Sequence, residues 1–405
     1  MNLFVALLGL AFLILIHEAG HFFVALAVGM NPRKFYLGFP PAIAKTTRRG
    51  IEYGIGAIPL GGYVKIPGMH RPAAGDLDLH FGRAVQEEPS VRRPVEELRR
   101  QLDESDYASA REAVTRVRDA VSTAEGLSPV ALRSAERGLV EVDDALAPDA
   151  YWRAKTWKRV AVILAGPAAN LVFAVALFTA LLMAIDGDYR LGIQLGRDGE
   201  RETGVVEQVA TESPAESAGL RQGDRIVAID GEAVSAAAIP AHIRASRGRP
   251  IQLTVVRGGE RVELAAVRPL KSDPYGFGES VKYAFQYTWD VTKEIGKSIG
   301  RLAKGEGRKD ISSPVGIVQG SSEALEEGTD NYLRVLGLIS LSLALLNLLP
   351  LLPLDGGHIA FSLVEGIRGR AVAREIYERV SVVGIAIVLL LFFIGLTNDI
   401  GRLGN

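Results

Sequence analysis

Four stretches of the chain are dominated by apolar residues and are separated by polar segments. They cover residues 3–28, 160–185, 335–354 and 380–396. About 20 apolar helical residues cross the hydrocarbon core of a bilayer, so each stretch is close to or above the length of a membrane span. The pattern therefore predicts a polytopic α-helical membrane protein with four transmembrane helices.

Basic residues gather in two of the connections between these helices, and such residues favour the cytoplasmic side of a membrane. They are Arg33, Lys34, Lys45, Arg48, Arg49, Arg153, Lys155, Lys158, Arg159, Arg368, Arg370, Arg374 and Arg379. This distribution predicts that residues 29–159 face the cytoplasm and residues 186–334 lie outside. Both termini are then extracytoplasmic.

The polar connections have patterns of their own. Residues 33–66 alternate apolar and small residues with many glycines, which predicts short strands in a membrane-associated β-hairpin region. One interpretation is an edge strand that pairs with an extended substrate, and the other is a loop packed beside the first helix. Residues 84–150 interleave Arg and Glu with Val, Leu and Ala at helical spacing, which predicts a helical hairpin with a solvated surface.

Residues 203–270 contain short β-branched runs, a helix opened by Ser213-Pro214, and glycine turns at Asp230-Gly231 and Gly258-Gly259. These features predict a small β-rich domain. The stretch SPAESAGLRQGDRIVAIDGEAV resembles a PDZ domain of the protease-associated kind, which implies an extracytoplasmic peptide-binding module. By that resemblance Gly204-Val205-Val206 would form the loop and strand of the groove. The helical stretch after it, with Phe285 and Trp289 on one side, suits either the membrane interface or packing on the β-rich domain.

We accordingly expect six segments, which follow the four spans and the three polar connections. They are 1–83 with the first helix and the β region, 84–150 as a charged helical insertion, 151–190 with the second helix, 191–275 as the β-rich domain, 276–334 as an amphipathic segment, and 335–405 with the last two helices.

Composition narrows the class of protein. The 405 residues are 48% hydrophobic and 23% charged, which indicates a chain that is partly in lipid and partly in water. The absence of cysteine excludes disulfides and thiolate ligands, so a metal site would use His and carboxylate groups. A formal net charge of −1 gives no basic surface for nucleic acid.

The first apolar stretch contains His17, Glu18 and His21 in the spacing H-E-x-x-H. In a helix the two histidines lie on one face and can bind one Zn²⁺, while Glu18 can accept a proton from water that the metal has acidified. Ionisable groups at membrane depth are expensive, which makes the cluster a functional candidate. The alternatives are a signal peptide ending near Ala25-Leu26-Ala27, which lacks a basic start, a chance motif, or a purely structural metal site.

The third apolar stretch ends with Asn347, Pro350, Pro353 and Asp355. Prolines break a helix, and Asp355 supplies the carboxylate that a two-histidine site lacks. Three ligands leave a fourth position for water, as catalytic zinc sites require. Within the second stretch Asn170 is an amide in an apolar helix, and we interpret it either as a packing group or as a group beside the metal site.

Together, H-E-A-G-H at 17–21, the N-x-x-P-x-x-P-L-D-G run at 347–356, the GGYVKI strand and the GPAAN helix resemble the site-2 protease family of intramembrane zinc metalloproteases, in its bacterial RseP-like branch. The resemblance implies that His17, His21 and Asp355 hold zinc, that Glu18 is catalytic and that Asn347 helps to hold substrate. It also implies a multi-pass protein of the bacterial inner membrane, with its active site open to the cytoplasm. Its substrates would be single-pass membrane proteins, such as anti-sigma factors, that another protease has already cut. Two rival hypotheses are a membrane metal carrier and a PDZ scaffold with an inactive site.

Overall fold

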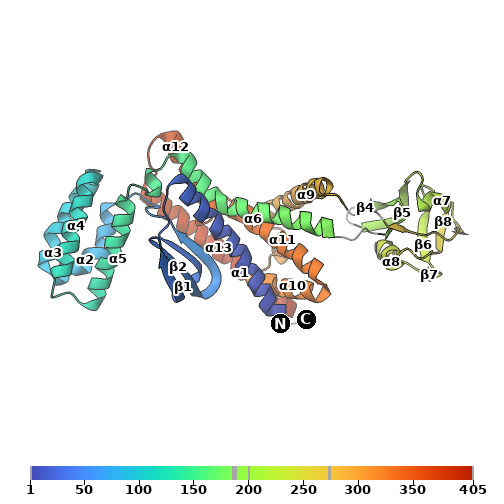
Figure 1. The fold of residues 1–405 in the computed structure, drawn as a ribbon, viewed down its shortest axis with the longest axis horizontal. Helices are drawn as coiled ribbons and strands as arrows, with labels where there is room; N and C mark the ends of the chain where they lie inside the picture. Colours follow the sequence, from blue (N-terminus) through green and yellow to red (C-terminus); the bar gives the residue numbers. More distant parts are fainter. Residues whose placement is uncertain (1, 185–188, 199–200, 272–274, 404–405) are drawn as a thin grey trace. The chain divides into compact units, whose positions relative to one another are not determined.

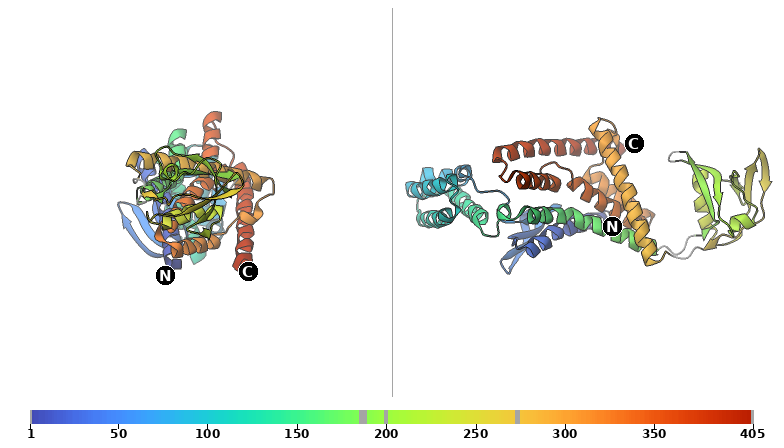
Figure 2. Two further views of the ribbon diagram at one scale, coloured as in Figure 1. Left: turned by 90° about the vertical axis from the view of Figure 1, so that its right-hand side faces the viewer. Right: turned by 90° about the horizontal axis from the view of Figure 1, so that it is seen from above.

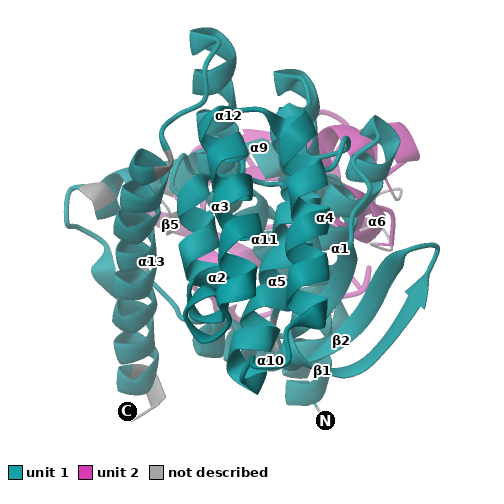
Figure 3. Ribbon diagram, turned by 90° about the vertical axis from the view of Figure 1, so that its left-hand side faces the viewer, with its two compact units in different colours: residues 1–175, 288–405 teal, residues 176–287 magenta. Residues whose placement is uncertain are grey.

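The computed structural model describes residues 2–184, 189–198, 201–271 and 275–403, and the chain divides into two compact units (Figure 3). One unit comprises Met1–Val175 with Thr288–Asn405, and the other comprises Ala176–Tyr287. The first contains the apolar helices, a β-hairpin and a helical bundle. The second contains most of the β-strands.

Within the part of the chain that the structure describes, four helices are long and apolar enough to cross a membrane, as the sequence pattern predicts (Figure 1). They are α1 (Asn2–Val28), α6 (Thr156–Ala184), α11 (Thr329–Asn347) and α13 (Arg374–Leu403). The third ends at Asn347, seven residues before the end of the apolar run at 354, because Pro350 and Pro353 cannot continue a helix. A new helix, α12 (Asp355–Arg368), begins after this break.

The glycine-rich region forms two long strands that pair with each other in several short segments, as the alternating pattern predicts. Strand β1 spans Lys34–Arg48 and β2 spans Ile51–Lys65, and the hairpin lies beside α1 (Figures 1 and 2). Residues 34–37 pair with 62–65 on one side and with 52–55 on the other. Within the described part of the chain residues 62–65 have no second strand neighbour, so they form an open edge.

Residues 74–146 fold into a bundle of four helices, α2 (Ala74–Glu87), α3 (Pro89–Asp103), α4 (Tyr107–Thr123) and α5 (Pro129–Leu146). The predicted helical hairpin over 84–150 was therefore wrong. The chain breaks at Ser105, whose φ is +58°, and the Asp106 side chain caps α4 by accepting a hydrogen bond from the Ser109 amide. The bundle has its own apolar core, which includes Leu77, Phe81, Val91, Leu98, Val117 and Leu139.

Four charged residues connect this bundle to the base of the hairpin, and we call them the hairpin clamp. Asp144 of α5 accepts from Arg33 Nε at 2.9 Å and from Lys65 Nζ at 2.8 Å. Asp149 accepts two further bonds from the Arg33 guanidinium, each 3.1 Å long. Arg33 directly precedes β1 and Lys65 ends β2, so both ends of the hairpin are held by one short segment.

In the other unit the main sheet has the strand order β4-β5-β6-β8-β9, with β7 paired to β6. Its strands are β4 (Ile193–Asp198), β5 (Arg201–Val209), β6 (Arg225–Ile229), β7 (Glu232–Ala233), β8 (Leu253–Arg257) and β9 (Glu260–Glu263), and two short strands, β3 (Tyr189–Arg190) and β10 (Leu270–Lys271), pair with each other. Helices α7 (Pro214–Ser217) and α8 (Ile239–Ala245) pack on a core that includes Val206, Ile226, Ile239, Leu253 and Val255.

Two further helices complete the chain. Helix α9 (Phe277–Ala303) exposes Phe285 and Trp289, and α10 (Pro314–Glu327) packs against α1. The α13 residue Asp399 accepts hydrogen bonds from the backbone amides of Ser313 and Gly316 at 2.7 and 3.1 Å. It therefore satisfies two of the amides at the start of α10 that have no helical partner.

Helices α1 and α6 are in close contact at Gly20. A Cβ atom at this position would lie 2.3 Å from the Ala165 carbonyl oxygen and 3.0 Å from the Ala169 Cβ. We expect Gly20→Ala to lower the free energy of unfolding by roughly 1–3 kcal/mol, since backbone must move to admit the methyl group. Unfolding of the detergent-solubilised protein measures this change. Gly296→Ala in α9 is the matched control, because nothing lies within 4 Å of its added methyl, and its stability should stay the same or rise slightly.

The Arg257 guanidinium holds the pKa of the Asp224 carboxyl below its usual range through two hydrogen bonds of 2.7 Å. Because this folded-state pKa is depressed, the pair stabilises the fold fully above the unfolded pKa of about 4 and loses that contribution as the pH falls through the folded pKa. We expect Asp224→Asn to be less stable than wild type at pH 7, with the difference shrinking below about pH 4. Thermal unfolding of the segment 189–271 across pH tests this, and a constant difference would contradict it.

Candidate metal centre

The two histidines of α1 point their Nε2 atoms at one place. They are four residues apart, so they share a face of the helix, and their Nε2 atoms lie 3.2 Å apart. The His21 Nδ1–H donates to the Val162 carbonyl of α6 at 2.8 Å, which leaves the His21 Nε2 as the free nitrogen. The spacing in the sequence thus becomes a pair of convergent nitrogen atoms.

The helix break brings Asp355 to the same place from more than 330 residues away. Asp355 is the first residue of α12, and its Oδ2 lies 3.1 Å from His17 Nε2 and 3.4 Å from His21 Nε2. Gly356 is packed against the Leu348 and Leu349 carbonyl oxygens, each 2.3 Å from where its Cβ would be. A side chain at 356 would therefore push Asp355 away from the histidines.

Helix α6 forms the wall of the site. A Cβ on Gly166 would lie 2.3 Å from His21 Nε2 and 2.9 Å from His17 Cε1, so only glycine leaves room for both rings. The same helix holds α12, since Arg159 donates to Glu365 at 2.6 Å in a largely buried ion pair. The Tyr151 hydroxyl adds a 3.0 Å hydrogen bond with Ser362 of α12. These contacts fix the direction from which Asp355 enters.

The three side chains fit a zinc ion. Ligand atoms about 2.0–2.1 Å from a tetrahedral zinc lie about 3.3 Å from one another, and the distances here are 3.1, 3.2 and 3.4 Å. Two imidazoles and a carboxylate form a donor set that zinc takes in proteins. Among the described residues this is the one cluster of His and carboxylate groups that could hold a metal ion.

Glu18 lies at the boundary between this cluster and the hairpin. Its carboxylate accepts a hydrogen bond from the Val64 backbone N–H, and a Cβ on Gly62 would meet its Cγ at 2.9 Å. The open edge strand at 62–65 therefore runs directly past Glu18. A polypeptide laid along that edge would place its backbone beside the candidate base.

Other residues singled out from the sequence lie elsewhere. Asn347 ends α11, half-buried, and its role in substrate binding stays a prediction. His358 is outside the metal cluster and lies 2.8 Å from the Tyr377 hydroxyl, while burial lowers the pKa of its imidazole to about 4. Asn170 is buried on α6. The Gly166 wall and the Arg159–Glu365 pair were not anticipated, because neither belongs to a short motif that signals metal binding.

Comparison with known proteins places the chain. The model of peptidase family M50 matches residues 5–391. The chain belongs to peptidase family M50. It is 29% identical to the zinc metalloprotease RasP of Geobacillus kaustophilus over 427 residues, covering 96% of this chain and 95% of the relative. It is also 29% identical to the regulator of sigma-E protease RseP of Salmonella typhimurium over 460 residues, covering 99% of each.

Membership of M50 confirms the site-2 protease resemblance and the class of enzyme, a zinc metalloprotease. With four apolar helices, this M50 chain is a membrane protein. The family match spans both compact units, so the β-rich unit belongs to the matched region as well.

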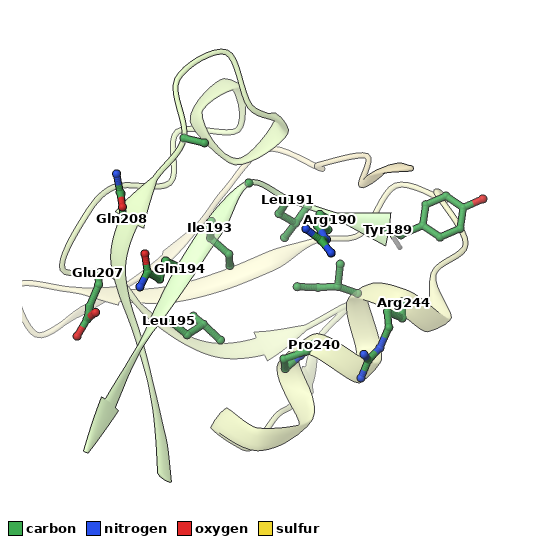
Figure 4. A pocket seen from close by; sticks show the side chains of 13 residues that line it. Tyr189, Arg190, Leu191, Ile193, Gln194, Leu195, Glu207, Gln208, Pro240 and Arg244 are labelled. Carbon is green, nitrogen blue, oxygen red and sulfur yellow. The ribbon is translucent and has the colours of Figure 1, made fainter. Parts of the chain in front are cut away.

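A second candidate site of this M50 protein lies in the β-rich unit, in a cavity of about 900 Å³ (Figure 4). It is lined by Leu191, Ile193 and Leu195 at the sheet edge and by Pro240, Ile243 and Arg244 of α8. The groove was expected at Gly204–Val206, but β5 lies between β4 and β6, and among the described strands the sheet ends at β4 and at β9. Strand β4 pairs with the edge of β5 at which a bound peptide was expected.

The geometry predicts that zinc depends on the carboxylate of α12. We expect Asp355→Asn to weaken zinc binding by more than about 100-fold, since loss of an outer-shell partner alone costs about 10–100-fold. Metal analysis of the purified protein after competition with a chelator measures this. His358→Gln, three residues away, should keep its zinc, and equal losses in the two variants would refute the assignment.

Proposed function

We propose that this protein is an intramembrane protease that hydrolyses a peptide bond within the transmembrane segment of a single-pass membrane protein. The observation that carries the proposal is that His17 and His21, on a helix apolar enough to cross a bilayer, meet Asp355 of α12 in one cluster with Glu18 next to it. We assign His17, His21 and Asp355 as zinc ligands and Glu18 as the catalytic acid and base.

Zinc, when bound, would polarise the scissile carbonyl and make a water molecule acidic. Glu18 would take the proton of the attacking water and deliver it to the leaving amine nitrogen. The Val64 N–H donates a hydrogen bond to the Glu18 carboxylate and orients it toward the hairpin. Hydrolysis consumes a water molecule, so water must reach the site, and we assign this access to the cytoplasmic side.

A substrate helix must unwind before its amides can be attacked. The strand edge at 62–65 is where the unwound segment would bind. An extended chain can add to an open sheet edge through main-chain hydrogen bonds. Gly61 and Gly62 carry no side chains that would keep such a segment away from the strand. We propose that Asn347, at the end of α11, also contacts the substrate.

The β-rich unit would act as an extracytoplasmic PDZ-type module. The cavity between β4 and α8 combines a terminal strand of the sheet with a mixed apolar and polar lining, which suits an extended peptide. We infer a multi-pass protein of the bacterial inner membrane, with both termini extracytoplasmic. Its substrates would be membrane proteins, such as anti-sigma factors, whose extracytoplasmic part another protease has removed. A relative carries the name regulator of sigma-E protease, which supports this class.

The proposal predicts that Glu18→Gln lowers cleavage of a co-expressed single-pass substrate by at least roughly 100-fold, because general acid–base catalysis contributes about 10²–10⁴-fold. Zinc content should be unchanged, since Glu18 is outside the ligand set. Glu141→Gln, which removes an exposed carboxylate of the bundle, is the matched control and should cleave normally.

The same experiment separates the rival functions. A scaffold with an inactive site would keep its phenotype in Glu18→Gln. A metal carrier would show zinc-dependent transport and no cleavage of the substrate by wild type. Either result would refute the protease function.

A further inference from the structure

Asn170 is a buried amide on α6, the helix that forms the wall of the metal centre, and the proposed reaction does not use it. Its side chain is fully buried, and neither Oδ1 nor Nδ2 has a hydrogen-bond partner among the described residues. Its backbone carbonyl accepts from Ser340 Oγ of α11 at 2.9 Å, so contact with that helix does not involve the amide. Leaving a buried polar group unpaired is destabilising, so such a group is expected to have a partner.

A second unpaired group lies on the facing helix. His17 Nδ1 is buried and has no partner in the described part of the chain, whereas His21 Nδ1 donates to the Val162 carbonyl. A metal-binding histidine usually donates its other ring N–H to an oxygen atom, which fixes the tautomer and the ring orientation. His21 has such a partner, and His17 needs one.

The helix geometry brings the two groups together. Contacts between His21 and Val162, His17 and Gly166, and Phe12 and Phe173 show that α1 and α6 run antiparallel. Asn170 follows Gly166 by four residues, so the two share a face of α6. A helical side chain leans toward the N-terminus of its helix, which directs the Asn170 amide over Gly166.

The His17 ring lies at the same place. Its Cε1 atom would be 2.9 Å from a Cβ on Gly166, and Nδ1 is covalently bonded to Cε1. The unpaired ring nitrogen and the unpaired amide are therefore directed at one short stretch of the α1 and α6 interface. Gly166 has no side chain to separate them.

We propose that Asn170 is a positioning residue for His17. One buried water would accept the His17 Nδ1–H and donate to the Asn170 Oδ1, which keeps the His17 Nε2 free for the metal. The inference rests on the proposed zinc ligands and adds an outer partner for one of them. Asn170 would thus act on the metal through His17 without touching the substrate.

Zinc affinity of the purified protein, measured by chelator competition, tests the proposal. We expect Asn170→Leu, which has a similar volume and no polar atom, to lower the affinity by about 10–100-fold. Asn170→Asp keeps an oxygen acceptor and should stay within about threefold of wild type. The visible absorption of the cobalt-substituted protein should change in Asn170→Leu and be restored in Asn170→Asp.

Ser340→Ala is the matched control, because it removes the hydrogen bond to the Asn170 backbone and leaves the amide in place. It should retain wild-type zinc affinity. Unchanged affinity in Asn170→Leu, or an equal loss in Ser340→Ala, would overturn the inference and leave Asn170 a packing residue. If Asn170→Leu does not fold, Asn170→Asp decides, since a folded aspartate variant that loses zinc tenfold would also overturn it.

Asp355→Asn, measured in parallel, distinguishes this inference from the proposed function. If Asp355→Asn binds zinc like wild type, the metal is not at the proposed site, and both proposals fail. If Asp355→Asn loses zinc while Asn170→Leu does not, the zinc ligands stand and the positioning role alone fails.

Discussion

The structure depends on burying three polar side chains among apolar helices. An isolated charge in hydrocarbon is expensive, and it persists only where other groups of the protein compensate it. Here His17, His21 and Asp355 compensate one another, with all three ligand atoms within 3.4 Å. That requirement explains the local features around them: α1 and α6 must touch at glycine, α11 must end early, and α12 must start with the carboxylate.

The second organising feature is the position of the hairpin. Its edge strand runs past Glu18, so the candidate base lies next to a strand edge along which an extended chain could pair. The Val64 amide and Gly62 are the hairpin groups that contact Glu18, so they set the distance between the edge strand and the candidate base. The β-rich unit offers a separate strand edge beside α8. Each unit thus has a terminal strand that is not covered by another described strand, 62–65 in one and β4 in the other.

The sequence was sufficient for the parts whose signal is local or chemically costly. Apolar length gave the four helices, and His17, Glu18, His21 and Asp355 stood out because such residues are rare in apolar runs. The bundle was misjudged, because the break at Ser105 depends on a positive φ that serine seldom adopts. The strand expected to line the groove, β5, lies inside the sheet, because strand order follows from pairings that a local motif does not reveal. The Gly166 wall could not be inferred, since it depends on which helix packs on α1. The membrane orientation and the role of Asn347 stay predictions.

The hairpin clamp connects the bundle of helices α2–α5 to the open strand edge at residues 62–65. Arg33 and Lys65 carry like charges at the two feet of the hairpin, and Asp144 holds both of them together. Neutralising or withdrawing that single carboxylate would let the two feet repel each other. Lys65 is the last residue of the edge strand 62–65, and Gly62 of the same strand lies beside Glu18. A displacement of α5 would therefore shift the strand that faces the candidate base.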